Sequence, residues 1–231
     1  MKKSNAAMWL VCLAAIPLTL FLGSKLSGRW YYLTSTLIIG ELLIPFFMAF
    51  EGRRPQAREL VLMAVLCALA VAARVAIPVP NFKAIYGIIM IAGIALGPQP
   101  GFLVGAIAAL ASNFFYAQGP YTPWQMMAYG MAGMLAGFLF RKNRLPRKPV
   151  TMAIAGFLVP LLVVGPLLDT CSLFLTPITL NVKNAIKLYT VGLPMNLIQS
   201  ASTAVVMFLL GRPMLGKLER IQRKYGLLDL E

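Results

Sequence analysis

Long apolar runs, broken at short intervals by glycine, proline and charged residues, make up most of the chain. A helix rises about 1.5 Å per residue, so about 20 apolar residues cross the hydrocarbon core of a bilayer. Breaks such as Gly97-Pro98-Gln99-Pro100 and Gly119-Pro120 are typical of places where a helix leaves the membrane. The runs predict eight spans, at residues 6–22, 30–50, 58–79, 84–97, 101–117, 124–140, 151–170 and 190–210. The fourth and fifth are short, and we expect them to be tilted, kinked or buried by neighbours.

Composition supports a membrane class and adds a strong positive charge. Of 231 residues, 59% are hydrophobic and 12% are charged, whereas a soluble domain carries about a quarter charged residues. The net charge is +14, from 21 Lys and Arg against 7 Asp and Glu. These basic residues lie between apolar runs and form no RNA-binding motif. We therefore interpret the charge as a positive-inside signal with attraction to lipid head groups, and expect no nucleic-acid partner.

The distribution of charge predicts the orientation. With the N-terminus in the cytoplasm and eight spans, fifteen of the 21 basic residues fall inside and five outside, with Arg74 inside a span. We therefore predict that both termini are cytoplasmic. Lys2 and Lys3 before the first run also resemble the start of a signal peptide, but no small-x-small cleavage site precedes Lys25. We expect this segment to be retained as a helix.

The sequence lacks the residues that most catalytic sites require. It has no histidine, no Walker motif and no carboxylate pair, and Cys12, Cys67 and Cys171 lie far apart without metal-ligand spacing. Only Glu41 and Asp169 are carboxylates in or at the edge of a span. We therefore expect no enzyme activity, no metal site, no cofactor and no energy source within the chain.

The third span carries two features that we interpret separately. Arg74 lies inside the apolar run, which costs about 2.5–3.5 kcal/mol on insertion scales. It either extends to the outer head groups or reaches an outward-facing pocket, with Asp169 or Glu41 as a candidate counter-ion. Ala64, Ala68 and Ala72 recur every four residues and form a small-residue face for another helix, in a partner or within this chain. Arg74 lies about 200° around the helix from Ala72 and faces away from that stripe.

The loop after the fifth span, with its flanks, is uncharged and rich in aromatic and amide side chains. Tyr and Trp there are typical of an interfacial belt, which leaves the amides and Pro120 and Pro123 unexplained. Amides with rigidly held aromatic rings suit a planar, neutral molecule with polar edges. The candidate substrate-binding residues are Arg74, Asn113, Tyr116, Gln118, Tyr121, Trp124 and Gln125. Residues 173–189 are expected to form a solvated outer loop or, alternatively, to cap a pocket.

These features together resemble a known family. The stretch IIMIAGIALGPQPGFLVGAIAALASNFFYAQGPYTPWQM, the Ala-x-x-x-Ala face and the glycine-rich helix after the loop are similar to those of substrate-binding S-components of energy-coupling factor (ECF) vitamin transporters. The expected fold is an all-α membrane protein with two domains. Residues 1–56 would form two additional transmembrane helices, and 57–231 a six-helix S-component-like core with a short basic cytoplasmic tail.

The resemblance implies a mechanism and partners. S-components bind a vitamin outside the cell, under loops that here are 78–83 and 118–124, and dock on a transmembrane coupling subunit that works with two ATPase subunits. On this view Ala64, Ala68 and Ala72 dock the coupling subunit, and the whole S-component topples in the lipid to release its cargo. The location implied is a bacterial plasma membrane, as a multi-pass protein.

The substrate stays open at this point. The uncharged loop suits a flavin, a pterin, a deazapurine or a corrinoid. Its GPYTPWQ segment resembles that of cobalamin- or queuosine-precursor-type members of the family, which implies a substrate of that type. Arg74 and Lys83 would instead favour an anionic vitamin.

The alternative function is a non-transport polytopic scaffold, in which the alanine and glycine faces serve assembly.

Overall fold

The computed structural model describes residues 10–25, 37, 41, 57–76, 82, 84–175 and 181–226, and all regular structure within them is helical. Its elements are η1 (Val11–Ala15), α2 (Ile16–Lys25), α4 (Ala57–Ala76), α5 (Ala84–Leu96), α6 (Pro98–Tyr116), α7 (Thr122–Phe140), η2 (Arg141–Asn143), α8 (Pro149–Val159), η3 (Pro160–Val164), α9 (Gly165–Leu175) and α10 (Val182–Tyr225).

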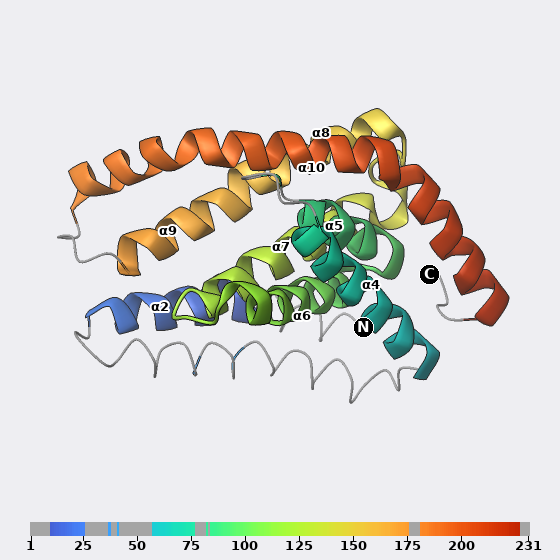
Figure 1. Cartoon of the computed structure of the whole chain (residues 1–231), viewed down its shortest axis with the longest axis horizontal. Coiled ribbons are helices and arrows are strands. Elements are labelled where there is room, and N and C mark those ends of the chain that lie inside the picture. The colour runs from blue at the N-terminus through green and yellow to red at the C-terminus, as the bar shows by residue number, and fades with distance from the viewer. Residues whose placement is uncertain are drawn as a thin grey trace.

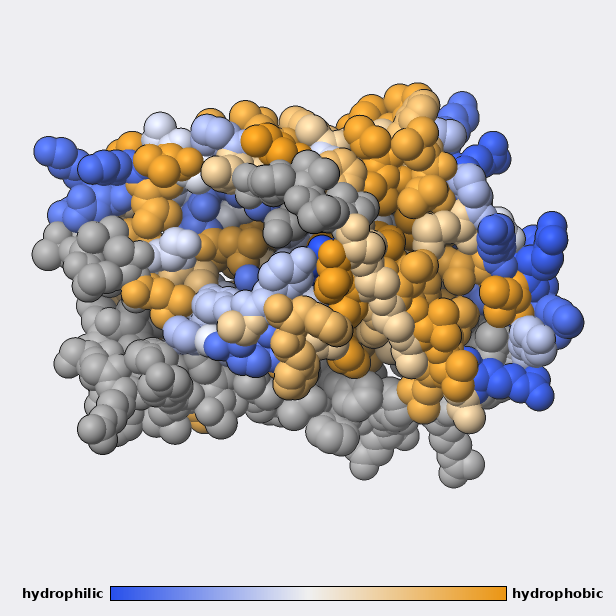
Figure 2. Space-filling model, viewed as in Figure 1, coloured by the Kyte–Doolittle hydropathy of each residue, from blue (hydrophilic) through white to orange (hydrophobic). Residues whose placement is uncertain are grey.

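The described part of 57–226 consists of six helical units, because α8, η3 and α9 form one uninterrupted rod. Proline has no backbone N–H and clashes with the preceding turn, which explains why the helix loosens into a π-helical turn, η3, at Pro160. The units form an elongated bundle, with α10 along one edge and α6 and α7 through the middle (Figure 1). Hydrophilic residues gather at both ends of the long axis, and hydrophobic surface lies between them (Figure 2).

Three helices of the described residues are long and apolar enough to cross a membrane: Ala57–Ala76, Pro149–Leu173 and Val182–Tyr225. The predicted fold class, an all-α membrane protein, is confirmed. The expectation for the short fourth segment is also confirmed, because all 13 residues of α5 are buried by their neighbours.

Glycine explains why α5, α6 and α7 can pack so closely. A Cβ atom on Gly133 would lie 2.2 Å from the backbone oxygen of Gly101, and one on Gly93 would lie 2.0 Å from that of Gly133. A Cβ on Gly105 would lie 2.3 Å from the oxygen of Tyr129. The three helices therefore meet backbone to backbone, which is the close contact that small residues allow in membranes.

The last helix is longer than the apolar pattern predicts. We expected a span at 190–210, an outer loop before it and a short tail after it, whereas α10 runs from Val182 to Tyr225. The loop expectation is therefore wrong for 182–189, where the Asn181 side chain accepts a hydrogen bond from the backbone N–H of Asn184 and caps the helix. Pro194 and Pro213 both lie within α10, and its last turns bend away from its main axis (Figure 1).

Most of the predicted two-helix extension lies outside the described residues, as do residues 78–81 and 83 of the first predicted pocket loop. Within it, α2 is helical to Lys25, and the Thr19 hydroxyl donates a hydrogen bond to Glu41. Glu41 therefore has a partner other than Arg74. The domain division at residue 56 stays a prediction.

Candidate functional site

Arg74 near the end of α4 meets neutral partners from α6. Its Nη1 group donates hydrogen bonds to the Ser112 hydroxyl and, over 3.0 Å, to Oδ1 of Asn113. Its guanidinium lies 4.7 Å from the ring centroid of Tyr116 and 5.8 Å from that of Tyr129, within reach of a cation–π interaction. The Tyr116 hydroxyl in turn donates to the backbone oxygen of Arg74 over 3.0 Å. Arg74 is thus held inside the bundle rather than extended freely toward head groups.

Asn113 connects Arg74 with α7. Its side chain is fully buried, and its Nδ2 group donates to the Thr122 hydroxyl over 3.2 Å and to Oε1 of Gln125 over 2.8 Å. The Thr122 hydroxyl donates to Oε1 of Gln118 over 3.0 Å. The chain of amides and hydroxyls therefore fixes the α6–α7 loop relative to Arg74. We call the set Arg74, Ser112, Asn113, Tyr116, Gln118, Thr122 and Gln125 the arginine cluster.

Two buried tyrosines, Tyr86 and Tyr129, connect the arginine cluster with α10. The rings of Tyr86 and Tyr129 meet edge to face, with centroids 4.8 Å apart. The Tyr86 hydroxyl donates to Oε1 of Gln199 over 3.3 Å. Buried tyrosine hydroxyls need such partners, and this one ties α5 to α10 beside Tyr129, whose ring also lies next to Arg74.

Asp169 belongs to a second polar group, between α9 and α10. It accepts a hydrogen bond of 2.7 Å from Nδ2 of Asn196, and a Cβ on Gly192 would lie 2.4 Å from Oδ1 of Asp169. Among the described residues no ion pair joins Asp169 to Arg74, so the counter-ion expected from the sequence is not in place. Among the described residues, the arginine cluster therefore has no carboxylate that pairs with Arg74. The Arg74 Nε atom is buried and lacks a hydrogen-bond partner in the described part of the chain.

The other predicted site residues differ in exposure. Gln118 is exposed and donates to the backbone oxygen of Leu110 over 3.0 Å, and the Tyr121 hydroxyl donates to that of Ala117 over 2.8 Å. Trp124 is only 5% exposed and forms part of the hydrophobic core. Arg74, Asn113, Tyr116, Gln118 and Gln125 are therefore brought into one network, whereas Tyr121 and Trp124 border it.

Sequence reasoning missed Ser112, Thr122 and Tyr86 as members of this polar region. Ser112 directly precedes Asn113, and Thr122 lies between Tyr121 and Trp124 of the predicted site. Their position in the sequence beside predicted site residues could therefore have identified both. Tyr86 stands in an otherwise apolar helix, and only the crossing of α5 with α7 and α10 reveals its role.

The alanine stripe lies on the outer face of α4. Ala64, Ala68 and Ala72 are exposed, whereas Leu62, Leu66 and Ala70 on the opposite face are buried. With respect to the described helices, the stripe is thus open to lipid or a partner, and packing among those helices does not account for it.

With this geometry described, comparison with known proteins gives one match. The family model described as "ECF-type riboflavin transporter, S component" matches residues 55–215. The chain belongs to this family. No curated protein and no solved structure matches it significantly. As an ECF S-component, it is the substrate-specificity subunit of a transporter and not an enzyme.

Membership also defines the setting of the site. ECF S-components bind small vitamin-like substrates and work with a transmembrane coupling subunit and two ATPases. The protein is therefore a multi-pass membrane protein whose energy comes from its partners, as expected from a chain without a Walker motif. This leaves substrate selection as the task of its own polar residues.

Proposed function

We propose that this S-component captures riboflavin, or a close flavin relative, at the arginine cluster and passes it inward when its ATPase partners act. One observation carries the proposal. Among the described residues, the Arg74 guanidinium bonds only neutral groups, Ser112 and Asn113, and tyrosine rings border it where α6 meets α7. The printed family description, which names riboflavin, supports the same substrate.

The chemistry of the cluster suits a flavin. A flavin is a planar, uncharged tricycle with carbonyl oxygens and ring nitrogens along one edge. Arginine offers five N–H donors in a plane, and only Nη1 of Arg74 has partners among the described side chains. Tyr116, half exposed beside the guanidinium, offers a ring face for stacking. Gln118 and Gln125 add amide groups that both donate and accept hydrogen bonds.

Other substrate classes are alternatives that the same binding experiment tests. A corrinoid or a queuosine precursor, which the loop sequence favours, would also use amides and aromatic rings. An anionic vitamin would use the charge of Arg74 more directly. These classes differ in charge and size, so one competition experiment separates them.

The test is a titration of the detergent-purified chain with riboflavin, followed by quenching of flavin fluorescence. We expect saturable binding with one site, competed weakly by flavin mononucleotide and not by cobalamin or a queuosine precursor. Arg74→Gln should weaken binding about tenfold to a hundredfold, because hydrogen bonds from a charged group contribute about 1.5–3 kcal/mol. Lys217→Gln, at the opposite end, is the matched control and should bind as the unmodified chain does. Absence of riboflavin binding with tight cobalamin or queuosine-precursor binding would refute the flavin assignment.

We further propose the arrangement in the cell. Both termini lie in the cytoplasm of a bacterium, supported by the basic residues that gather at the α7–α8 turn and the end of α10. The exposed stripe Ala64, Ala68 and Ala72 is the proposed docking face for the coupling subunit. The scaffold alternative has no comparable support, since the family is one of transport subunits.

A further inference from the structure

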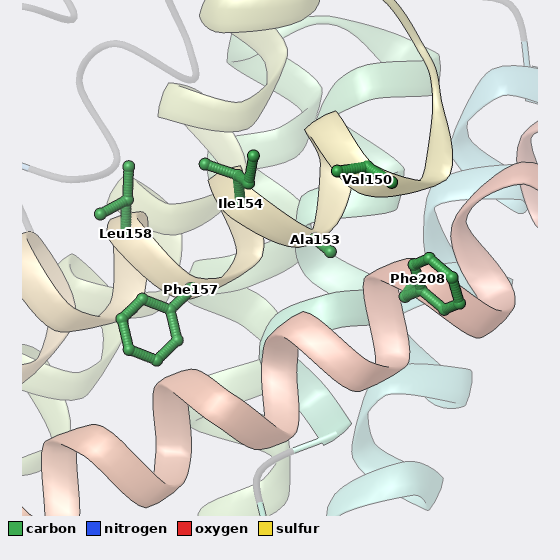
Figure 3. Close-up of a pocket in the computed structure, with 6 residues that line it drawn as sticks. All are labelled: Val150, Ala153, Ile154, Phe157, Leu158 and Phe208. Carbon is green, nitrogen blue, oxygen red and sulfur yellow. The ribbon is translucent and has the colours of Figure 1, made fainter.

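The outer surface between α8 and α10 is hollowed far from the arginine cluster. A shallow groove of about 350 Å³ is lined by Val150, Ala153, Ile154, Phe157, Leu158 and Phe208. The α8 residues recur at helical spacing along one side, and the rings of Phe157 and Phe208 lie between the two helices (Figure 3). From Val150 to Leu158 the helix rises about 12 Å. The lining is wholly apolar and elongated.

The two helices that border this groove, α8 and α10, pack closely against each other. A Cβ on Gly156 would lie 2.8 Å from Cγ of Met207, and one on Gly211 would lie 3.0 Å from Cε of Met152. Ala153 has no bulk to fill the space above these contacts. The groove is thus a consequence of small residues that let α8 and α10 approach, and large residues along its edges.

Among the described residues, positive charge borders the end of the groove at the start of α8. Lys148, the residue that precedes α8, is exposed two positions before Val150. Arg212 is exposed one helical turn after Phe208, on the same face of α10. The neighbouring Arg147 is already paired with Glu219 at 2.6 Å, so Lys148 and Arg212 supply the charge at this end. The start of α8, which has no side-chain cap, adds the partial positive charge of a helix N-terminus.

We propose that this groove binds one phospholipid with an anionic head group, from the leaflet at the basic end of the bundle. An acyl chain lies along Val150, Ile154 and Leu158, and the phosphate and its acidic head group meet Lys148 and Arg212. Charge complementarity favours this occupant over a second copy of the chain, because two copies joined at the groove would bring the same cations together. The bound lipid anchors this end of the S-component in its leaflet.

Native mass spectrometry of the detergent-purified full chain tests the proposal. Phosphatidylglycerol or phosphatidylcholine with identical acyl chains is added at equal concentration, and the first adduct is compared. We expect about a thirtyfold preference for phosphatidylglycerol, because each of the two cations near the head group contributes about 1 kcal/mol. Lys148→Gln with Arg212→Gln should remove this preference. The control pair Lys183→Gln with Lys187→Gln, on exposed residues of the other end, should keep it.

A second pair of variants locates the acyl chain. Ala153→Phe fills the groove and should abolish the first adduct, whereas Val205→Phe, on an exposed residue of α10 outside the groove, should not. Thermal unfolding of each variant shows that the fold is retained. Equal binding of the two lipids, an unchanged preference in the Lys148 and Arg212 variant, or an unchanged adduct in Ala153→Phe would each overturn the proposal. A dimer that Ala153→Phe dissociates would assign the groove to a second copy instead.

Discussion

The central helix α5 and the peripheral helices α4 and α10 differ in how much of their surface is buried. All 13 residues of α5 are buried, whereas a third of the apolar stretch is buried in both α4 and α10. The centre is held by glycine contacts between backbones, and the outer helices keep faces for lipid and for partners. The α5–α6–α7 centre thus carries most of the polar site residues and meets Arg74 of α4, while α4 and α10 keep exposed apolar faces.

The largest effect is expected where the glycine contacts are closest. Gly133→Ala would place Cβ 2.2 Å from the Gly101 oxygen, and no flexible side chain can move aside. We expect a loss of at least about 3 kcal/mol and little folded protein. Gly216→Ala in α10, with no atom within 4 Å of its added Cβ, should gain about 1 kcal/mol of helix propensity. Thermal unfolding in detergent measures both. Equal melting temperatures would show that the centre is not held by backbone contact.

A smaller effect is expected within the arginine cluster. Asn113→Ala removes a buried side chain that bonds Arg74, Thr122 and Gln125, which should cost about 2 kcal/mol or more because its partners are left unsatisfied. Gln118→Ala, at an exposed position, should cost less than about 1 kcal/mol. Urea or thermal unfolding compares the two. An Asn113→Ala chain as stable as Gln118→Ala would contradict the network. Asn113 and Trp124 are both buried, so replacing either with alanine is expected to change stability as well as ligand binding.

A substitution on the exposed face of α4 is expected to reduce transport without lowering thermal stability. Ala68→Trp adds bulk to an exposed position and should leave thermal stability and riboflavin binding unchanged, yet stop uptake in cells that carry the whole transporter. Ala70→Trp, on the buried face, should destabilise the chain by about 1–3 kcal/mol. Normal uptake with Ala68→Trp would refute the docking face.

The smallest effect is expected at the surface ion pair. Arg147 and Glu219 lie 2.6 Å apart, but their side chains are about a third exposed, at 32% and 35%. Arg147→Gln should therefore change stability by no more than about 1 kcal/mol and leave uptake unchanged. A larger loss in a melting experiment would mean that the basic end is as tightly held as the centre.

Helix positions were predicted most closely at α5 and α7, where glycine or proline lies at an end of the apolar run. The predicted spans 84–97 and 124–140 differ by one or two residues at their ends from α5 and α7, since Gly97 and Pro123 lie at their boundaries. The extent of α10 was not predictable from apolarity. Its polar ends are helical through capping by Asn181 and through tertiary contacts such as the 2.9 Å bond from Gln222 to the Ala95 oxygen.

The site was predictable in its residue types but not in its pairing. The local pattern identified Asn113, Gln118 and Gln125, because amides in an uncharged loop need partners or ligands. It could not pair Arg74 with Ser112 and Asn113, which are 38 and 39 positions away and meet only because α4 crosses α6. Charge alone favoured Asp169, whereas the structure pairs that carboxylate with Asn196.

Mass spectrometry of the small molecules released when the detergent-purified protein is denatured tests the central claim most directly. A ligand that binds tightly is retained during purification, so we predict riboflavin, or a close flavin relative, near one molecule per chain. Arg74→Gln should release much less of it. Recovery of a corrinoid or a deazapurine at that stoichiometry, with no flavin, would contradict the account.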